Sequence, residues 1–234
     1  MTKEYFLLNV EAPMVSFGSP RIDNRAPTYD VPTKSSLVGL IGNAFGVDAR
    51  DVSWLQRLQD NIDLAYGVVR PGRSFVDYQT ADFSKPYMGG ADGNSGWSSS
   101  GKIVRRESSV DVLSNRRQLW KGYISDPHIV VAMWFVDQHL FTEPELDQAL
   151  TYPRRVLYWG RKSCVPSGDI YRGSVFANSP VDALKGVSGL KFNKFLVPLD
   201  GPVPPGSSLV QMSSNRDWRV DRHGGNSVYQ VVLP

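Results

Sequence analysis

The spacing of hydrophobic residues changes from a helical to a strand period within the first third of the chain. Leu37, Leu40, Ile41 and Phe45 recur at the three- and four-residue spacing of one helix face. Between residues 62 and 68, apolar positions instead alternate with polar or small ones. This period of two is typical of a strand that is buried on one face. The first segment therefore predicts a helix, and the second predicts a half-buried strand.

The start of the predicted helix carries capping signals. Pro32 fixes its own φ and keeps Val31 extended, and Thr33 can cap the first exposed amides. Lys34 and Ser35 then open the helix, so that amide groups, the helix dipole and an ammonium would face one point. This turn could hold a phosphate. The alternative is a capped amphipathic helix that simply lies on a sheet.

Similar signals predict further elements and an α+β fold class. These elements are a strand over 5–11, a helix over 51–61 that starts at an Asp cap, a central strand over 128–137, and a helix that starts at the capping box Thr142/Glu145 and runs to about Thr151. Strand, helix, strand, insertion, strand, helix is an order typical of a ferredoxin-like or RRM-like sandwich. Gly39 and Gly42 would let the first helix pack closely on the sheet.

A Gly/Ser-rich stretch interrupts the predicted sandwich. Residues 89–101 contain five glycines and four serines, which is too flexible a composition for a core. The segments 102–108 and 116–126 could pair as an insertion hairpin. We therefore expect an insertion over about 71–122.

The C-terminal part of the chain has a different pattern. From residue 191, short hydrophobic runs are separated by Gly, Pro and Asn turns, which predicts strands without helices. We expect a small C-terminal β subdomain over 191–234, next to a main domain over 1–190.

Composition excludes several protein classes. A chain of 234 residues with 41% hydrophobic content can bury one large core or two small ones. Cys164 is the single cysteine, so an internal disulfide is impossible. The longest apolar run, 129–136, is too short to span a bilayer, and the N-terminal residues lack the pattern of a secretion signal. We expect a soluble, cytoplasmic protein without a membrane partner, metal or other cofactor.

Charge is concentrated in two segments. Residues 101–122 carry six Lys or Arg against two acids, and residues 154–172 carry five against one, while the whole chain has a net charge of only +3. Two basic segments on a mildly acidic body suggest a groove for a polyanion.

Other motifs are weaker. Residues 96–103 match a phosphate-binding loop, but Ile103 stands where a magnesium-binding hydroxyl belongs, which disfavours a nucleotide-triphosphatase. The histidines at 128, 139 and 223 show no zinc spacing and are better assigned to structure or surface. His223, beside two glycines, is the one that could act as a general base.

Four motifs together resemble one family. Residues 5–20 (YFLLNVEAPMVSFGSP), 32–47 (PTKSSLVGLIGNAFGV), 126–134 (DPHIVVAMW) and 158–166 (YWGRKSCVP) occur in the order and at roughly the separations found in Cas family 5. Members are CRISPR-associated RAMP subunits of type I-E Cascade. Residues 213–220 (SSNRDWRV) add a further similarity. The resemblance covers most of the chain and is weakest in the Gly/Ser-rich insertion.

The resemblance implies a structural role in a prokaryotic ribonucleoprotein. A family member has an RRM-like fold with a β-hairpin thumb, here at about 71–122, and caps the repeat-derived 5′ handle of the guide crRNA without catalysis. Its partners would be the crRNA, a CasC-like backbone subunit, a CasA-like large subunit and, indirectly, target DNA.

The resemblance and the chemistry of RNA binding together nominate site residues. By resemblance, Lys34 and Ser35 at the helix start and Arg161 and Lys162 would grip phosphates. Single-stranded RNA is held by cations along its backbone and by aromatic faces under its bases. Further cations could be Arg105, Arg106, Arg116, Arg117 and Lys121, and stacking faces could be Trp97, Trp120, Tyr158 or Trp159.

Two alternatives remain open. Some relatives in the family cut repeat RNA with a Tyr, Lys and His cluster, so a metal-independent endoribonuclease could use His128 or His223 with Lys121. In this chain no histidine adjoins a lysine, which departs from that pattern. The other alternative is a free-standing RNA chaperone, although a long Gly/Ser-rich arm would need a partner to offset its ordering entropy.

Overall fold

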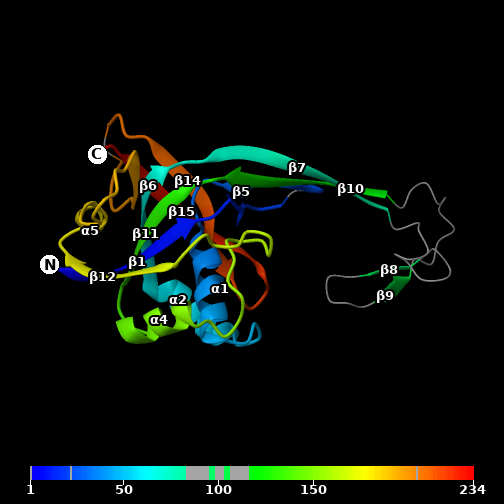
Figure 1. Cartoon of the computed structure of the whole chain (residues 1–234), viewed down its shortest axis with the longest axis horizontal. Coiled ribbons are helices and arrows are strands. Elements are labelled where there is room, and N and C mark those ends of the chain that lie inside the picture. The colour runs from blue at the N-terminus through cyan, green and yellow to red at the C-terminus, as the bar shows by residue number, and fades with distance from the viewer. Residues whose placement is uncertain (1, 22, 83–94, 98–102, 106–115, 204) are drawn as a thin grey trace. The chain divides into compact units, whose positions relative to one another are not determined.

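A computed structural model describes the chain except for residues 1, 22, 83–94, 98–102, 106–115 and 204 (Figure 1). The chain divides into two compact units. The main unit comprises residues 1–20, 28–75 and 123–234, and the smaller unit comprises residues 21–27 and 76–122. The helices of the described residues all belong to the main unit.

The main unit is built on an antiparallel sheet of seven strands. Their order is β12 (Tyr171–Ala177), β1 (Lys3–Glu11), β11 (His128–Phe135), β6 (Ile62–Arg70), β13 (Lys194–Pro198), β15 (Arg222–Val232) and β14 (Leu209–Asp217). Every residue of β11 is buried. The predicted strand over 5–11 and the predicted central strand over 128–137 are confirmed.

The three predicted helices begin where the sequence signals place them. They are α1 (Lys34–Phe45), α2 (Val52–Asn61) and α4 (Glu143–Thr151), and a short helix that was not predicted, α5 (Pro180–Lys185), follows β12. Thr33 caps α1 by accepting a hydrogen bond from Ser36 N, and Asp51 caps α2 by accepting one from Trp54 N. The capping box of α4 is formed, with the amide of Thr142 donating to Glu145 Oε2 at 2.7 Å. These three helix predictions are confirmed.

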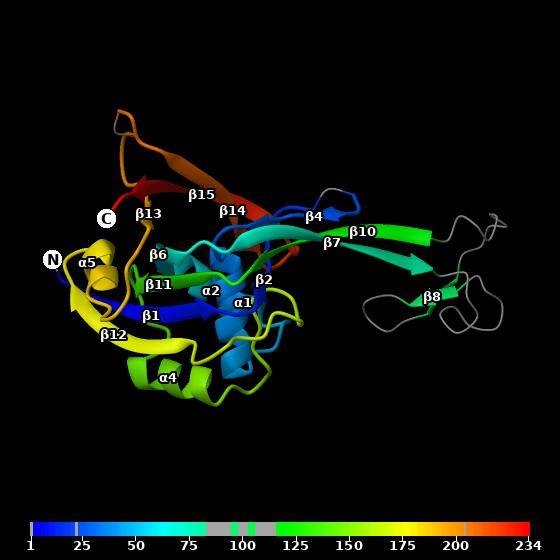
Figure 2. The same cartoon turned by 45° about the horizontal axis from the view of Figure 1, so that its top comes forward.

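Alternate residues of the strands face two separate cores. Phe6, Leu8 and Val10 of β1 belong to the larger core beneath α1, α2 and α4, whereas Tyr5 and Leu7 belong to a second core that includes α5. Figures 1 and 2 show α5 on the opposite side of the sheet from the other helices. The strand period of two therefore places apolar side chains on both faces of the sheet.

The prediction that β6 is buried on one face is wrong. Ala65 has no exposed surface, and a Cβ built on Gly67 would lie 2.5 Å from Cε1 of Phe192. The second core covers this face, so small residues stand there because neighbours approach closely.

The role expected for the glycines of α1 is also different. A Cβ on Gly42 would lie 2.9 Å from Cδ2 of Leu55, so Gly42 allows close packing on α2 rather than on the sheet. A Cβ on Gly39 would have only an ordinary contact, 3.8 Å from Cη2 of Trp218.

The strands beyond residue 191 extend the main sheet. β13 pairs with β6 through Lys194↔Val68, Phe195↔Gly67 and Leu196↔Tyr66, and β15 and β14 follow. The predicted strands are present, but they do not form a sheet of their own because β13 aligns with a central strand.

The remaining described strands are short or lie near the insertion. They are β2 (Met14–Val15), β3 (Phe17–Gly18), β4 (Arg25–Ala26), β5 (Thr28–Tyr29), β7 (Arg73–Asp82), β8 (Ser95–Trp97), β9 (Ile103–Arg105) and β10 (Arg116–Ser125). β9 pairs with β8, while β10 pairs with β7, β2 and β4. The expected pairing of 102–108 with 116–126 is therefore wrong. Most of the Gly/Ser-rich stretch 89–101 lies outside the described residues.

No helix among the described residues is both long enough and apolar enough to cross a membrane.

Candidate nucleic-acid interface

The main unit contains an open cavity of about 490 Å³. Four segments line it: one side of α1 as far as Asn43, residues 157–161, residues 16–19, and residues 216–223, which span the turn that joins β14 to β15. Sequence positions that are up to about 200 residues apart thus meet at one site.

The first turn of α1 is fixed to the sheet by hydrogen bonds. The amide of Lys34 donates to Ser214 Oγ at 2.8 Å, and the hydroxyl of Tyr66 donates to the Pro32 carbonyl at 2.7 Å. Ser35 and Ser36 line the cavity. The amides of Lys34 and Ser36 already have partners within the protein. The Ser36 hydroxyl donates to the Thr33 carbonyl at 2.8 Å, and the Ser35 hydroxyl lies 3.2 Å from Thr33 Oγ1. A hydroxyl oxygen can accept a further hydrogen bond, so this turn presents two partly engaged hydroxyls to the cavity.

Lys34 lies elsewhere than the sequence suggests. Its ammonium is 2.9 Å from Asp63 Oδ1 on β6, and its side chain is only 13% exposed. Lys34 is not among the residues that line the cavity. Its contact with RNA therefore stays a prediction, and the pairing with Asp63 neutralises the charge on which that prediction depends.

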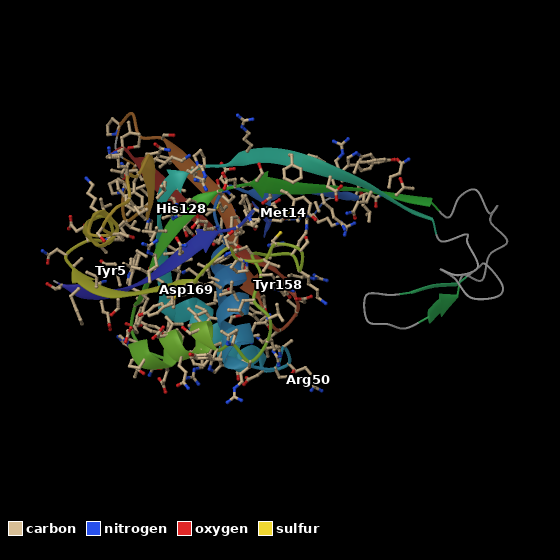
Figure 3. All side chains as sticks on the ribbon, in the orientation of Figure 1. Tyr5, Met14, Arg50, His128, Tyr158 and Asp169 are labelled. Atoms are coloured by element: carbon tan, nitrogen blue, oxygen red, sulfur yellow. The ribbon has the colours of Figure 1, made fainter. Side chains whose placement is uncertain are left out.

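Residues 157–161 reach the cavity through a glycine turn. Gly160 has φ +88°, and a Cβ there would lie 1.7 Å from the Ser16 carbonyl oxygen, so only glycine fits. The amide of Ser16 donates to the Trp159 carbonyl at 3.1 Å. This arrangement brings Tyr158 and Arg161 to the cavity, and Figure 3 labels Tyr158 on this segment. The Arg161 guanidinium lies 4.5 Å from the centroid of the Tyr123 ring.

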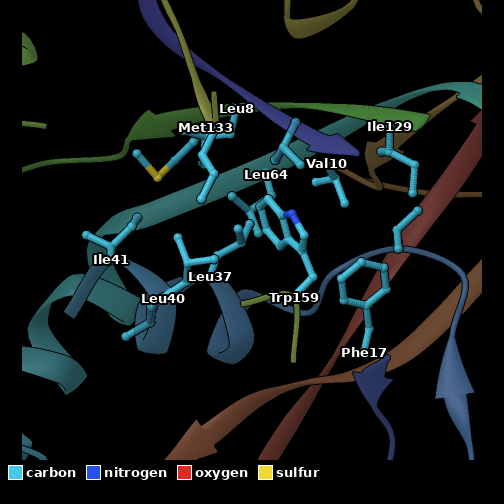
Figure 4. Packing of buried hydrophobic residues seen from close by; sticks show 14 of the residues in the cluster. Leu8, Val10, Phe17, Leu37, Leu40, Ile41, Leu64, Ile129, Met133 and Trp159 are labelled. Atoms are coloured by element: carbon cyan, nitrogen blue, oxygen red, sulfur yellow. The ribbon is translucent and has the colours of Figure 1, made fainter. Parts of the chain in front are cut away.

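Trp159 points the other way, into the core. It is 2% exposed and packs among Leu37, Leu64 and Phe17, as Figure 4 shows. Its use as a stacking face for RNA is therefore excluded, because the indole would first have to leave the core. Of the neighbouring aromatic residues Tyr158 and Trp159, only Tyr158 lines the cavity.

The segment around the turn between β14 and β15 supplies three residues that sequence reasoning did not single out, Arg216, Trp218 and Arg222. His223, the candidate general base of the sequence analysis, lines the cavity beside them with Asp221. The Arg216 guanidinium lies 5.1 Å from the centroid of the Trp218 ring and forms an ion pair with Asp221. Partial burial lowers the pKa of Arg216. The sequence signals for this segment were the similarity of residues 213–220 to Cas family 5 and the position of His223 beside two glycines.

The cavity suits an anionic, partly aromatic ligand. Three arginines line it against one aspartate, together with serine and threonine hydroxyls and one indole. Cations that follow a backbone, with aromatic faces beside them, are the elements by which proteins hold single-stranded nucleic acid. Among the residues that the structure describes, no group of three or more His, Cys, Asp or Glu side chains could hold a metal ion.

The histidines have different surroundings. His128 is buried, its Nε2 lies 3.0 Å from Asn9 Oδ1, and desolvation lowers its pKa. His139 packs against Phe135 with ring centroids 4.6 Å apart. His223 is exposed at the cavity.

Several nominated residues lie away from the cavity or cannot be placed. Lys162 is exposed but does not line the cavity. Lys121, in the smaller unit, donates to Gln79 Oε1 at 2.6 Å. In the same unit the Trp120 ring lies 5.4 Å from Tyr78 and 5.6 Å from the Arg25 guanidinium. Outside the described part lie Arg106 and the side chains of Trp97, Arg105, Arg116 and Arg117.

A mixed α/β fold with such a cavity has the features of a protein that binds single-stranded nucleic acid. Comparisons with known proteins then identify the family. The chain belongs to the CRISPR-associated protein (Cas_Cas5) family, which matches residues 5–227. The resemblance to Cas family 5 is therefore confirmed.

The individual proteins that this chain resembles also carry CRISPR or Cas names. The chain is 29% identical over 183 residues to the CRISPR system Cascade subunit CasD of Escherichia coli (strain K12), which covers 78% of this chain and 76% of CasD. A chain of a CRISPR RNA-guided surveillance complex has the same fold, with a TM-score of 0.65 at 22% identity over 98% of this chain and 89% of that chain. A Cas protein crystal structure matches with a TM-score of 0.52 at 25% identity, covering 100% of this chain and 95% of that chain.

Proposed function

We propose that this chain is a non-catalytic RNA-binding subunit of a type I CRISPR Cascade complex, which caps the repeat-derived 5′ handle of the guide crRNA. The observation that carries the proposal is the family match over residues 5–227, together with the similarity to a Cascade subunit. The cavity of the main unit supports it with a site of suitable chemistry.

In this proposal the cavity holds the RNA backbone. Arg161, Arg216 and Arg222 supply guanidinium groups, which match phosphate geometry with paired N–H donors. The Ser35 hydroxyl, which also lines the cavity, can add a hydrogen bond to a phosphate. Lys162, exposed next to Arg161, would contact RNA that extends beyond the cavity.

The finer structural assignments belong to the same proposal. The main unit would be the RRM-like part, and the insertion over about 71–122 would be the thumb that contacts the RNA and a CasC-like backbone subunit. A CasA-like large subunit would contact the chain elsewhere. The separation of residues 76–122 from the main unit supports the position of the thumb.

The environments of the histidines support a non-catalytic role. His128 is buried against Asn9, and its lowered pKa favours a neutral ring that RNA cannot reach. His223 lines the cavity, but Lys34 is paired with Asp63 and no lysine is among the lining residues. A His–Lys pair of the kind that cuts repeat RNA is thus not supported at the cavity.

The test is to recover the tagged chain from its host and to sequence the RNA that copurifies. We expect guide RNAs that share one short repeat-derived 5′ end, together with other Cascade subunits. Arg161→Ala should lower the amount of RNA recovered. Arg50→Ala is the matched control, because Arg50 lies in an exposed ion pair with Asp48 and does not line the cavity. Mixed RNA, or none, would overturn the proposal.

A further inference from the structure

An indole and a guanidinium lie next to each other where β14 ends and the turn to β15 begins. Trp218 and Arg216 both line the cavity, 5.1 Å apart from guanidinium carbon to ring centroid. Trp159, by contrast, is almost fully buried. Trp218 packs against the larger core with part of its surface and lines the cavity with another part, so its indole can offer an apolar surface to a ligand.

A buried glutamine fixes this pair in place. Gln59 of α2 is 3% exposed, and its Nε2 donates to the Arg216 carbonyl at 2.8 Å. Its Oε1 accepts from the Arg216 amide at 3.0 Å and from Trp218 Nε1 at 3.1 Å. Gln56 Oε1 adds a bond from the Trp218 amide at 3.3 Å.

These bonds hold the polar edge and the backbone amide of Trp218, and part of its apolar surface packs against the larger core. Cη2 of Trp218 lies near Gly39 at the cavity wall, where a Cβ would be 3.8 Å from the ring. The ring is thus fixed by hydrogen bonds and packing before any ligand arrives, which lowers the ordering cost of binding.

Arg216 already holds a carboxylate where a phosphate oxygen would fit. Its ion pair with Asp221 leaves the aspartate side chain 74% exposed and the arginine side chain 39% exposed. A carboxylate and a phosphate both accept paired N–H bonds from a guanidinium. Because the Asp221 side chain is the more exposed partner of this pair, an incoming phosphate can compete with it for the guanidinium.

We infer that Trp218 and Arg216 form a subsite for one unpaired nucleotide of the guide RNA. The base stacks on the Trp218 indole, and the adjoining phosphate takes the place of the Asp221 carboxylate on Arg216. Gln59 is a positioning residue for both side chains. This inference rests on the proposed function and names the nucleotide contact that the cavity makes.

The experiment measures the affinity of the full chain for the RNA with which it copurifies, using a set of RNAs with one abasic nucleotide at each position. A stacked base changes affinity by about 5- to 150-fold. We expect one abasic position to weaken binding to the wild-type chain by a factor in this range. Trp218→Ala should bind the intact RNA about as weakly and should no longer respond to that abasic position.

Two further variants keep the inference testable if Trp218→Ala does not fold. Trp218→Phe retains an aromatic face, so the response to the abasic position should persist. Gln59→Met keeps the volume of the side chain but loses its three hydrogen bonds, and it should weaken the response in folded protein. A merely structural role for Gln59 would instead lower the melting temperature and leave the response unchanged.

The outcomes separate this inference from the proposed function. If the wild-type chain binds no RNA, both fail. If Arg161→Ala weakens RNA binding while no abasic position matters, or while Trp218→Ala keeps the same positional response, the proposed function stands and the subsite is overturned.

Discussion

The two glycines of α1 predict opposite effects of one added methyl group. Gly39 lies inside the helix with a negative φ, and a Cβ there makes an ordinary contact of 3.8 Å with Trp218. Alanine is favoured over glycine within a helix by about 1 kcal/mol. Gly39→Ala should therefore stabilise the protein by about 0.5–1 kcal/mol.

Gly42→Ala gains the same stabilisation from helix preference, but crowding against Leu55 offsets this gain in the free energy of unfolding. The new Cβ would lie 2.9 Å from Cδ2 of Leu55, which is 5% exposed and cannot easily move. Overpacking of a buried contact costs about 1–3 kcal/mol, so the net effect should range from neutral to a loss of about 2 kcal/mol. The difference between the two variants should thus be about 1–3 kcal/mol.

Urea unfolding followed by circular dichroism measures both free energies, and thermal melting gives a second value. In a chain of this length, 1 kcal/mol corresponds to a shift of about 2–4 °C in Tm. If Gly42→Ala stabilises the protein as much as Gly39→Ala does, the conclusion that α1 packs closely on α2 at Gly42 is refuted. If Gly39→Ala destabilises the protein, the conclusion that a methyl group fits beside Trp218 is refuted.

Three more changes have defined outcomes. Gly160→Ala should destabilise the fold by more than about 1–3 kcal/mol. The φ of +88° alone costs about this much for a residue with a side chain, and the Ser16 carbonyl also blocks the methyl group. Gly168→Ala, where a Cβ would meet nothing within 4 Å, is the control in the same melting experiment. Burial lowers the pKa of His128. The contribution of the neutral ring to stability is therefore complete above its pKa in the unfolded chain, about 6.5, and declines as the pH falls below that value. His128→Gln should flatten the pH dependence of the free energy of unfolding below about pH 6.5, and an unchanged slope would contradict this. Asp221→Asn should tighten RNA binding by up to about 5-fold, because it removes the anion that is paired with Arg216. Asparagine tolerates the φ of 58° at this position, so the turn should keep its conformation. Weaker binding would mean that Asp221 positions Arg216 instead.

Local signals in the sequence predicted helix starts well. The caps at Thr33 and Asp51 and the capping box at Thr142 depend on residues within three positions of each other, and each forms as expected. Signals of this range do not show what covers a strand. The second face of β6 is buried because α5 packs there, and the sequence reasoning did not predict α5.

The candidate site was predictable only in part, because its geometry depends on distant residues. Arg161 and Ser35 line the cavity, but the pairing of Lys34 with Asp63, on another element, could not be read from the capping pattern. Nor does composition distinguish Trp159, buried in the core, from Trp218, exposed to the cavity. Both differences arise from tertiary packing.

The bond between the Lys34 amide and Ser214 joins residues 180 positions apart, and Gln59 meets Arg216 across 157 positions. During synthesis the N-terminal segments leave the ribosome first, so the helix start and α2 exist well before their partners on β14. One wall of the cavity is absent until β14 and β15 have been made and have joined the sheet. A nascent chain that ends before β14 therefore lacks the wall with Arg216 and Arg222, which limits premature RNA binding at this site.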